Sequence, residues 1–168
     1  MLKLTKKADY GLIALKHLAN AGPGATASAK EIAEAYSVPP PLLAKILQKL
    51  VKQGFLRSEH GTNGGYKLAR EAARINALEV IRAIDGPIIL TSCFTEHGAC
   101  DQSDRCNVRE PLRKIHEGIL RLLANITIAD MADDTPLGPD SKLYELTIPA
   151  PRVVPRAPEE VTQGVCPQ

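Results

Sequence analysis

The stretch between residues 28 and 70 constrains the fold of this chain more than any other part of the sequence. Ser28 stands three residues before Glu31, which is the capping-box pattern that opens a helix. The inward side of this short helix is expected to comprise Ile32, Ala33 and Tyr36. A helix must therefore begin at about residue 29 and end before the prolines that follow at 39–41.

A second helix is predicted directly after those prolines, because proline fits only before a helix or in its first turn. Apolar residues then recur at helical spacing until Gly54 stops the run: Leu42, Leu43, Ile46, Leu47, Leu50 and Val51. Two short helices joined by a tight connection of about four residues form the pattern of a helix-turn-helix.

A β-hairpin is predicted immediately after the second helix. Residues 55–58 and 66–69 are short strand-like runs, and the glycine-rich stretch 61–65 lies between them as a flexible tip. A hairpin in this place makes a winged helix-turn-helix, in which the helix enters the major groove of DNA and the wing lies along the backbone or minor groove.

The polar residues of these elements are the candidate DNA contacts. On the second helix they are Lys45, Gln48, Lys49 and Lys52, and on the wing they are Arg57, Lys67 and Arg70. The charge distribution agrees with a polyanionic partner, since residues 1–85 hold thirteen Lys and Arg against seven Asp and Glu. The alternative interpretation is an ordinary helical hairpin whose lysine face is merely solvated.

Helices are also predicted on both sides of this unit. The first spans residues 9–21, with Leu12, Leu15, Leu18 and Ala19 on one face. Another, at residues 75–86, turns Leu78, Ile81 and Ile84 inward before Gly86 and Pro87 close it.

A long amphipathic helix is expected to start at Asn107, because Glu110 three residues later completes a second capping box. Its apolar residues follow in alternating steps of four and three: Val108, Leu112, Ile115, Ile119, Leu122 and Ile126. Such a helix after a compact winged domain favours a homodimer, because a two-fold protein matches the half-sites of DNA.

Three of the four cysteines lie within fourteen residues, at Cys93, Cys100 and Cys106. The first residues lack the apolar stretch and the small-residue cleavage site of a signal peptide, and the sequence has no apolar run of the length that crosses a membrane. We therefore expect the protein in the cytoplasm, where thiols stay reduced and a disulfide is disfavoured. Catalysis by a thiolate would need a base and an oxyanion motif, and His97 alone does not supply them, so the protein is not expected to be an enzyme. Metal binding fits best, and soft thiolates select zinc or an iron–sulfur cluster.

The sequence thus predicts a mostly α-helical protein in three parts. Residues 1–85 form the DNA-binding winged helix-turn-helix, and residues 86–130 form the metal-binding loop and the dimerisation helix. Residues 131–168 are rich in proline and acidic residues and are expected to be a disordered tail, in which residues 144–148 could form a short strand. Cys166 in that tail is interpreted as a bystander.

The combination of "LTKKADYGLIAL", the helix-turn-helix, the wing "GGYKLAR" and the cysteine triplet resembles the bacterial iron–sulfur regulators typified by IscR and the nitric-oxide sensor NsrR. The nearest resemblance is to the branch that regulates SUF cluster-assembly genes. It implies a dimeric transcription factor for double-stranded DNA that carries a 2Fe-2S or 4Fe-4S cluster on Cys93, Cys100 and Cys106. Nitric oxide as the signal is an alternative within the same family.

The resemblance leaves the fourth ligand of the cluster open. IscR-like members have a histidine three residues after the third cysteine, where this chain has Arg109. NsrR-like members use an aspartate of the first helix, which corresponds to Asp9 here, while His97 could complete a local site instead. The alternative from another functional class is a helical interaction protein stabilised by structural zinc.

Overall fold

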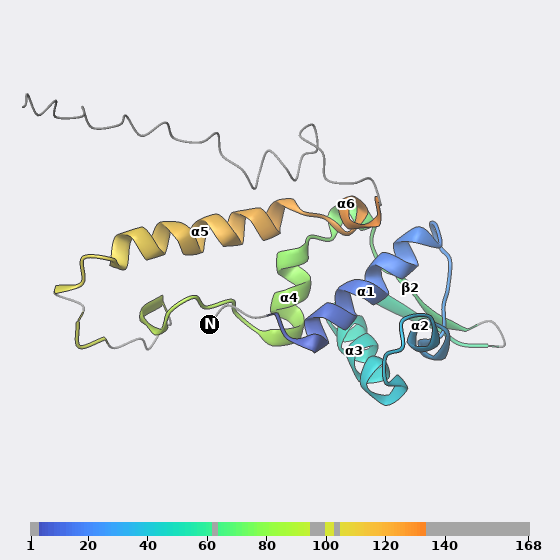
Figure 1. The fold of residues 1–168 in the computed structure, drawn as a ribbon. Helices are drawn as coiled ribbons and strands as arrows, with labels where there is room; N and C mark the ends of the chain where they lie inside the picture. Colours follow the sequence, from blue (N-terminus) through green and yellow to red (C-terminus); the bar gives the residue numbers. More distant parts are fainter. Residues whose placement is uncertain (1–3, 62–63, 95–99, 103–104, 134–168) are drawn as a thin grey trace, which may run out of the picture. The chain divides into compact units, whose positions relative to one another are not determined.

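The computed structural model describes residues 4–61, 64–94, 100–102 and 105–133, all of which belong to one compact unit, residues 1–136. In chain order the elements are α1 Lys6–Asn20, α2 Ala29–Ala35, α3 Pro40–Lys52, β1 Leu56–Glu59, β2 Gly65–Leu68, the 3-10 turn η1 Ala72–Arg74, α4 Ala77–Asp85, the 3-10 turn η2 Ser92–Phe94, α5 Arg109–Asn125 and α6 Ile128–Ala132 (Figure 1). The expected mostly helical fold with a two-stranded wing is confirmed. Among the described residues, no helix has the length and apolar character to span a membrane.

The core forms where α1, α3 and α4 pack together (Figure 1). Each helix presents an apolar stripe, and the fully buried side chains include Leu15, Leu18, Leu43, Leu47, Leu50 and Val80. Gly11 allows α1 to approach α4 closely, because a Cβ atom there would lie 2.3 Å from Cδ1 of Ile84. The inward-facing residues predicted for α4, Leu78, Ile81 and Ile84, are all buried.

The helix-turn-helix follows the sequence prediction except at Tyr36. The capping box of Ser28 and Glu31 is present, and Ile32 and Ala33 are buried. The prediction that Tyr36 faces inward is wrong, since 42% of this residue is exposed. The helix ends at Ala35 and Tyr36 is its C-cap with a non-helical φ of −117°, so its side chain leaves the inward face and places its hydroxyl 3.2 Å from Nδ1 of His17.

The turn between α2 and α3 contains a residue in the left-handed region of backbone space, Ser37, with φ +52°. A residue other than glycine is destabilised by roughly 1–2 kcal/mol in this region, and glycine removes that strain. The greater freedom of glycine in the unfolded chain offsets only part of the stability gained. We therefore expect Ser37→Gly to raise the free energy of unfolding by about 0.5–1 kcal/mol in urea titrations. The matched change Ser58→Gly, in strand β1, should lower it, and a destabilised Ser37→Gly variant would refute the idea that this turn is strained.

The wing is joined to the body of the protein through the segment that precedes α2. Strands β1 and β2 pair antiparallel, with Arg57 opposite Lys67. Ala27 forms a further bridge to Tyr66, through N···O distances of 3.0 and 2.8 Å. Gly65 permits this approach, since a Cβ atom there would lie 2.5 Å from the carbonyl oxygen of Ala27.

Helix α5 begins differently from the prediction. The expected capping box at Asn107 is absent, because the cap position is Val108, its backbone is helical, and no side chain bonds to the helix start. Pro111 does lie in the first turn. The described chain buries no residue of α5, and the apolar Val108 and Ile115 are 51% and 52% exposed.

The end of α5 is fixed to the winged domain by a connection that the sequence analysis did not predict. Ala77 N donates to the carbonyl oxygen of Ile126 and Ile128 N donates to that of Ile75, both at 2.8 Å. A capping box between Thr127 and Asp130 then opens the short helix α6, which packs against α1. Helix α6 ends at Ala132, inside the range 131–168 predicted as the tail, and residues 134–168, including 144–148 and Cys166, lie outside the described residues.

Candidate DNA interface and cysteine site

The outward side of α3 carries three of the predicted DNA contacts. Lys45, Gln48 and Lys52 are exposed and spaced three and four residues apart, so they share one helical face opposite the buried stripe. The two lysines form no ion pair with other described residues. These side chains are free to meet the edges of bases and the phosphates of DNA.

The start of α3 cannot bind phosphate through its backbone in the usual way. Proline occupies the cap and the first two helical positions, 39–41, and the next two amides, of Leu42 and Leu43, both donate to the carbonyl oxygen of Pro39. A helix N-terminus usually offers free amides to an anion. Because those donors are missing or used here, any contact by α3 must come from its side chains.

Lys49, a fourth predicted contact on this helix, is exposed like the other three but its amine has a partner within the protein. Its Nζ donates to the carbonyl oxygen of Ile84, at the end of α4, at 2.8 Å. The structure thus separates Lys49 from Lys45, Gln48 and Lys52.

Of the wing cations, Arg57 is exposed, whereas Lys67 and Arg70 have acidic neighbours. Lys67 Nζ lies 2.6 Å from Glu59 Oε1, and this hydrogen bond and charge lower the pKa of Glu59. Arg70 lies 3.5 Å from Glu79 and stacks at 4.9 Å over the ring of Phe55. Sequence reasoning missed these partners, since neither acid is a sequence neighbour of its cation.

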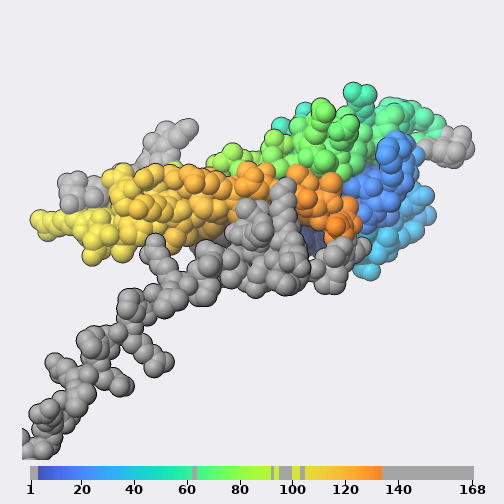
Figure 2. Space-filling view, turned by 90° about the horizontal axis from the view of Figure 1, so that it is seen from above, coloured from blue at the N-terminus to red at the C-terminus, as the bar shows by residue number. Residues whose placement is uncertain are grey.

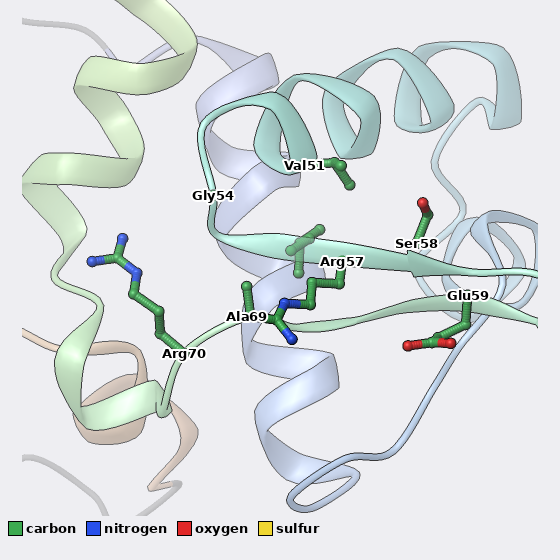
Figure 3. A pocket seen from close by; sticks show the side chains of 8 residues that line it. Val51, Gly54, Arg57, Ser58, Glu59, Ala69 and Arg70 are labelled. Atoms are coloured by element: carbon green, nitrogen blue, oxygen red, sulfur yellow. The ribbon is translucent and has the colours of Figure 1, made fainter.

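A shallow pocket of about 590 Å³ lies between the C-terminal end of α3 and the wing (Figure 3). Val51 of α3 forms one side of it, Arg57 and Ser58 come from β1, and Arg70 follows β2 (Figure 3). Arg57 and Ser58 offer donors for a phosphate of the DNA backbone beside α3, while Glu59 adds a negative charge to the lining and the guanidinium group of Arg70 extends toward α4 (Figure 3).

Glu59 pairs with the wing cation Lys67, so removing the charge of Glu59 should free the amine of Lys67 for a phosphate of DNA. We expect Glu59→Gln to strengthen binding to random-sequence duplex by up to about tenfold at 0.1 M salt and to steepen the salt dependence by about one. Titrations of a labelled duplex across a salt series give both values. Glu117→Gln on α5 changes the net charge equally and should leave them unchanged; equal effects of the two variants would show that Lys67 makes no contact.

The three cysteines lie in the chain between α4 and α5, residues 86–108, which we call the cysteine connection. Cys93, Cys100 and Cys106 are each half-buried, and none of them forms a disulfide in the described part of the chain. The hydroxyl of Thr91 lies 2.9 Å from Sγ of Cys93. Within the described ranges, no three His, Cys, Asp or Glu side chains gather closely enough to hold a metal, and His97 lies outside those ranges.

The Cys93 end of the cysteine connection contacts α5. Phe94, the next residue, stacks on His116 with ring centroids 5.3 Å apart. His116 was not singled out by sequence reasoning, because a histidine in an amphipathic helix carries no signal of its own.

Asp9, the predicted fourth ligand, lies in the first turn of α1 and is exposed. It shares a helical face with Thr5 and Leu12, which line an apolar groove of about 640 Å³. The same groove is lined by Ile88 and Ile89 of the cysteine connection. Asp9 itself is not among the residues that line this groove.

Comparison with known proteins decides the family. Residues 4–134 match the profile of Rrf2, described as an iron-dependent transcriptional regulator. The chain belongs to the Rrf2 family. This Rrf2 protein is accordingly a DNA-binding transcriptional regulator with a winged helix, and members of this family are regulators rather than enzymes.

Solved structures resemble this Rrf2 protein at similar levels. CymR (YrzC), the global cysteine regulator of B. subtilis, is 29% identical with a TM-score of 0.67, over 79% of this chain and 97% of its own. IscR of T. potens is 28% identical with a TM-score of 0.64, over 82% and 93%. CymR of Staphylococcus aureus is 26% identical with a TM-score of 0.64, over 77% and 97%. The likeness therefore supports the family without choosing between its branches.

Proposed function

We propose that this Rrf2 protein is a homodimeric regulator whose affinity for DNA depends on an iron–sulfur cluster held by Cys93, Cys100 and Cys106. The observation that carries the proposal is the position of three half-buried thiols, none of them in a disulfide, in the segment that leads from α4 of the winged domain to the start of α5. Three thiolates are a suitable donor set for such a cluster, which supplies an iron centre sensitive to oxidation and ligand exchange when bound.

The sequence from Cys93 to Cys106 has few apolar side chains, so binding a metal centre would supply the free energy that orders this part of the cysteine connection. Cys106 lies two residues before Val108, the cap of α5. Drawing the three thiolates together would therefore fix the start of α5 relative to α4. The DNA contacts on α3 and the wing would keep their identity while their spacing in the dimer changed.

The dimer interface is proposed to lie on α5. Its exposed apolar residues, Val108 and Ile115, have no cover in the described chain, and in Figure 2 the side of α5 toward the viewer is bare over most of its length. Large exposed apolar residues in a row mark an interaction surface. A two-fold pairing of α5 would place two copies of α3 against two half-sites of DNA.

Asp9 is our proposal for the fourth ligand. It is exposed on the face of α1 that borders the groove shared with Ile88 and Ile89, and a carboxylate is a weak partner for a soft cluster. An oxygen-ligated iron would exchange readily, as a sensor requires. His97 or a small exogenous ligand remains the alternative, and the two types of cluster, 2Fe-2S and 4Fe-4S, are both compatible with this set.

The target genes are proposed to be those of SUF cluster assembly, because the cysteine triplet and the wing resemble those of the regulators of such genes. A cysteine-responsive regulator is the second candidate, because the likeness to the cysteine regulator CymR is as strong as that to IscR. Control by nitric oxide would use the same cluster, whereas a zinc-stabilised interaction protein would use the same thiols for a structural metal.

The composition of an anaerobic preparation tests the proposal. We expect a brown protein that contains iron and acid-labile sulfide and absorbs visible light. A colourless protein with stoichiometric zinc would support the structural-metal alternative, and one with neither metal would favour the cysteine-responsive regulator.

A further inference from the structure

The C-terminal end of α4 is the place where the recognition helix meets the cysteine connection. Ile84 and Asp85 form the last turn of α4, and Gly86 caps it with φ +88°. Only six residues, 87–92, separate Gly86 from Cys93. A displacement of the cysteine connection must therefore act on this turn or be absorbed within that short segment.

Two polar contacts fasten other helices to this turn. Lys49 Nζ of α3 donates to the carbonyl oxygen of Ile84 at 2.8 Å, and Thr5 Oγ1 at the start of α1 donates to Oδ1 of Asp85 at 2.7 Å. The last four carbonyl groups of a helix have no partner within it, and a lysine there is also favoured by the helix dipole. The amine of Lys49 is thus used for holding α3 against the end of α4.

The other side of the same turn is joined to α5. Ile88 packs against the core, and Ile88 and Ile89 line the apolar groove together with Ile119 and Leu122 of α5. The residues that follow Gly86 therefore contact both the winged domain and α5. A change in the position of α5 would therefore reach the end of α4 through these side chains.

We propose that Lys49 is a positioning residue that couples the cysteine connection to the recognition helix, and that it is not a phosphate contact. The inference rests on the proposed cluster-dependent function. When the cysteine connection is drawn together, the last turn of α4 moves with it and the bond from Lys49 to Ile84 carries that movement into α3. A lysine whose amine had no fixed partner could not do this, whereas Lys49, although exposed, is bonded to Ile84.

The test compares four proteins: the parent, Lys49→Met, Lys49→Arg and Lys45→Met. Methionine keeps the apolar stem of Lys49 and removes the donor, while arginine keeps a charged donor. Lys45→Met is the matched control on the exposed face of the same helix. Each protein, with its cluster and after anaerobic removal of the cluster, is titrated over a salt series with a duplex that the parent has selected from a random-sequence pool. Thermal unfolding of each variant checks that it is folded.

For the parent we expect the loaded and stripped forms to differ at least about fivefold in affinity. Lys49→Met should reduce this ratio to within about twofold of one and leave the salt slope of the stripped protein unchanged, while Lys49→Arg restores the ratio. Lys45→Met should keep the ratio and lower the slope by about one.

A Lys49→Met protein that keeps the parental ratio overturns the inference, and so does one whose slope falls by about one, because that result makes Lys49 a phosphate contact. Should Lys49→Met fail to fold, Lys49→Arg decides. This variant retains a charged donor for Ile84, so a loss of the affinity ratio in it would also overturn the inference. A parent with a bound cluster and no difference between its two forms would instead refute the proposed function.

Discussion

Replacing Cys106 by serine is expected to leave the protein unable to retain an iron–sulfur cluster. The thiol is half-buried, lies next to the start of α5 and is one of the three proposed cluster ligands. A hydroxyl is a hard, poorly ionised donor and cannot replace a thiolate at iron. Loss of a residue that merely supports a ligand already weakens metal binding roughly 10–100-fold, so loss of the ligand should exceed that range.

The measurement is the iron and sulfide content of the Cys106→Ser protein after anaerobic reconstitution, together with its visible absorption. Cys166→Ser is the matched control, because Cys166 is the remaining cysteine of the sequence and is not proposed to be a ligand. Full occupancy in the Cys106→Ser protein, or equal loss in both variants, would argue against the assigned ligand set.

Placing a charge at Ile115 is expected to separate the dimer. Ile115 lies in the apolar row of α5 and yet is 52% exposed. Such exposure is expected of an interface residue when one subunit is considered without its partner. A glutamate there would have to be buried without a partner against the second copy, which opposes association by several kcal/mol. We therefore expect Ile115→Glu to weaken the dimer at least about a hundredfold and to abolish tight binding to a two-half-site operator.

Sedimentation velocity over a range of protein concentrations gives the dimer dissociation constant. Lys114→Glu introduces the same side chain one residue away, at an exposed position outside the apolar row, and should leave the dimer intact. Since α5 contributes no buried residue to the described chain, both variants should fold, and only Ile115→Glu should unfold at a lower temperature than the parent, because it loses the stabilisation by dimerisation. A dimeric Ile115→Glu protein would place the interface elsewhere.

Much of the fold could be predicted because its determinants are local. The capping box at Ser28, the prolines before α3 and the glycine-rich wing tip each fix a boundary through residues a few positions apart. The prediction for Tyr36 was wrong because it assumed that the helix continues through residue 36, whereas α2 ends at Ala35. The capping box predicted between Asn107 and Glu110 is absent because the helix is capped one residue later, at Val108.

The connection at residues 126–128 could not be predicted, because its hydrogen bonds join Ile126 and Ile128 to Ala77 and Ile75, some fifty residues away. Pairing at that separation depends on the whole fold rather than on sequence spacing. This pairing matters for the proposed function, because it fixes the C-terminal end of α5 to the winged domain. The position of the N-terminal end of α5 then depends on the cysteine connection.

The candidate site divides in the same way. The cysteine triplet was visible in the sequence because the thiol side chain itself carries the chemistry. The side chains of Lys45 and Lys49 are chemically identical and four residues apart on one helix, yet only the fold shows that Lys49 binds the carbonyl oxygen of Ile84. The partners Glu59 and Glu79, which hold Lys67 and Arg70, likewise depended on the strand register and on the packing of α4.

The most direct test of the central claim is one anaerobic titration of a selected operator duplex with the same protein preparation before and after its cluster is removed. The account predicts a brown, iron- and sulfide-containing protein whose dissociation constant changes at least about fivefold when the cluster is lost, with the dimer preserved. Equal dissociation constants for the fully loaded and the stripped protein would contradict it.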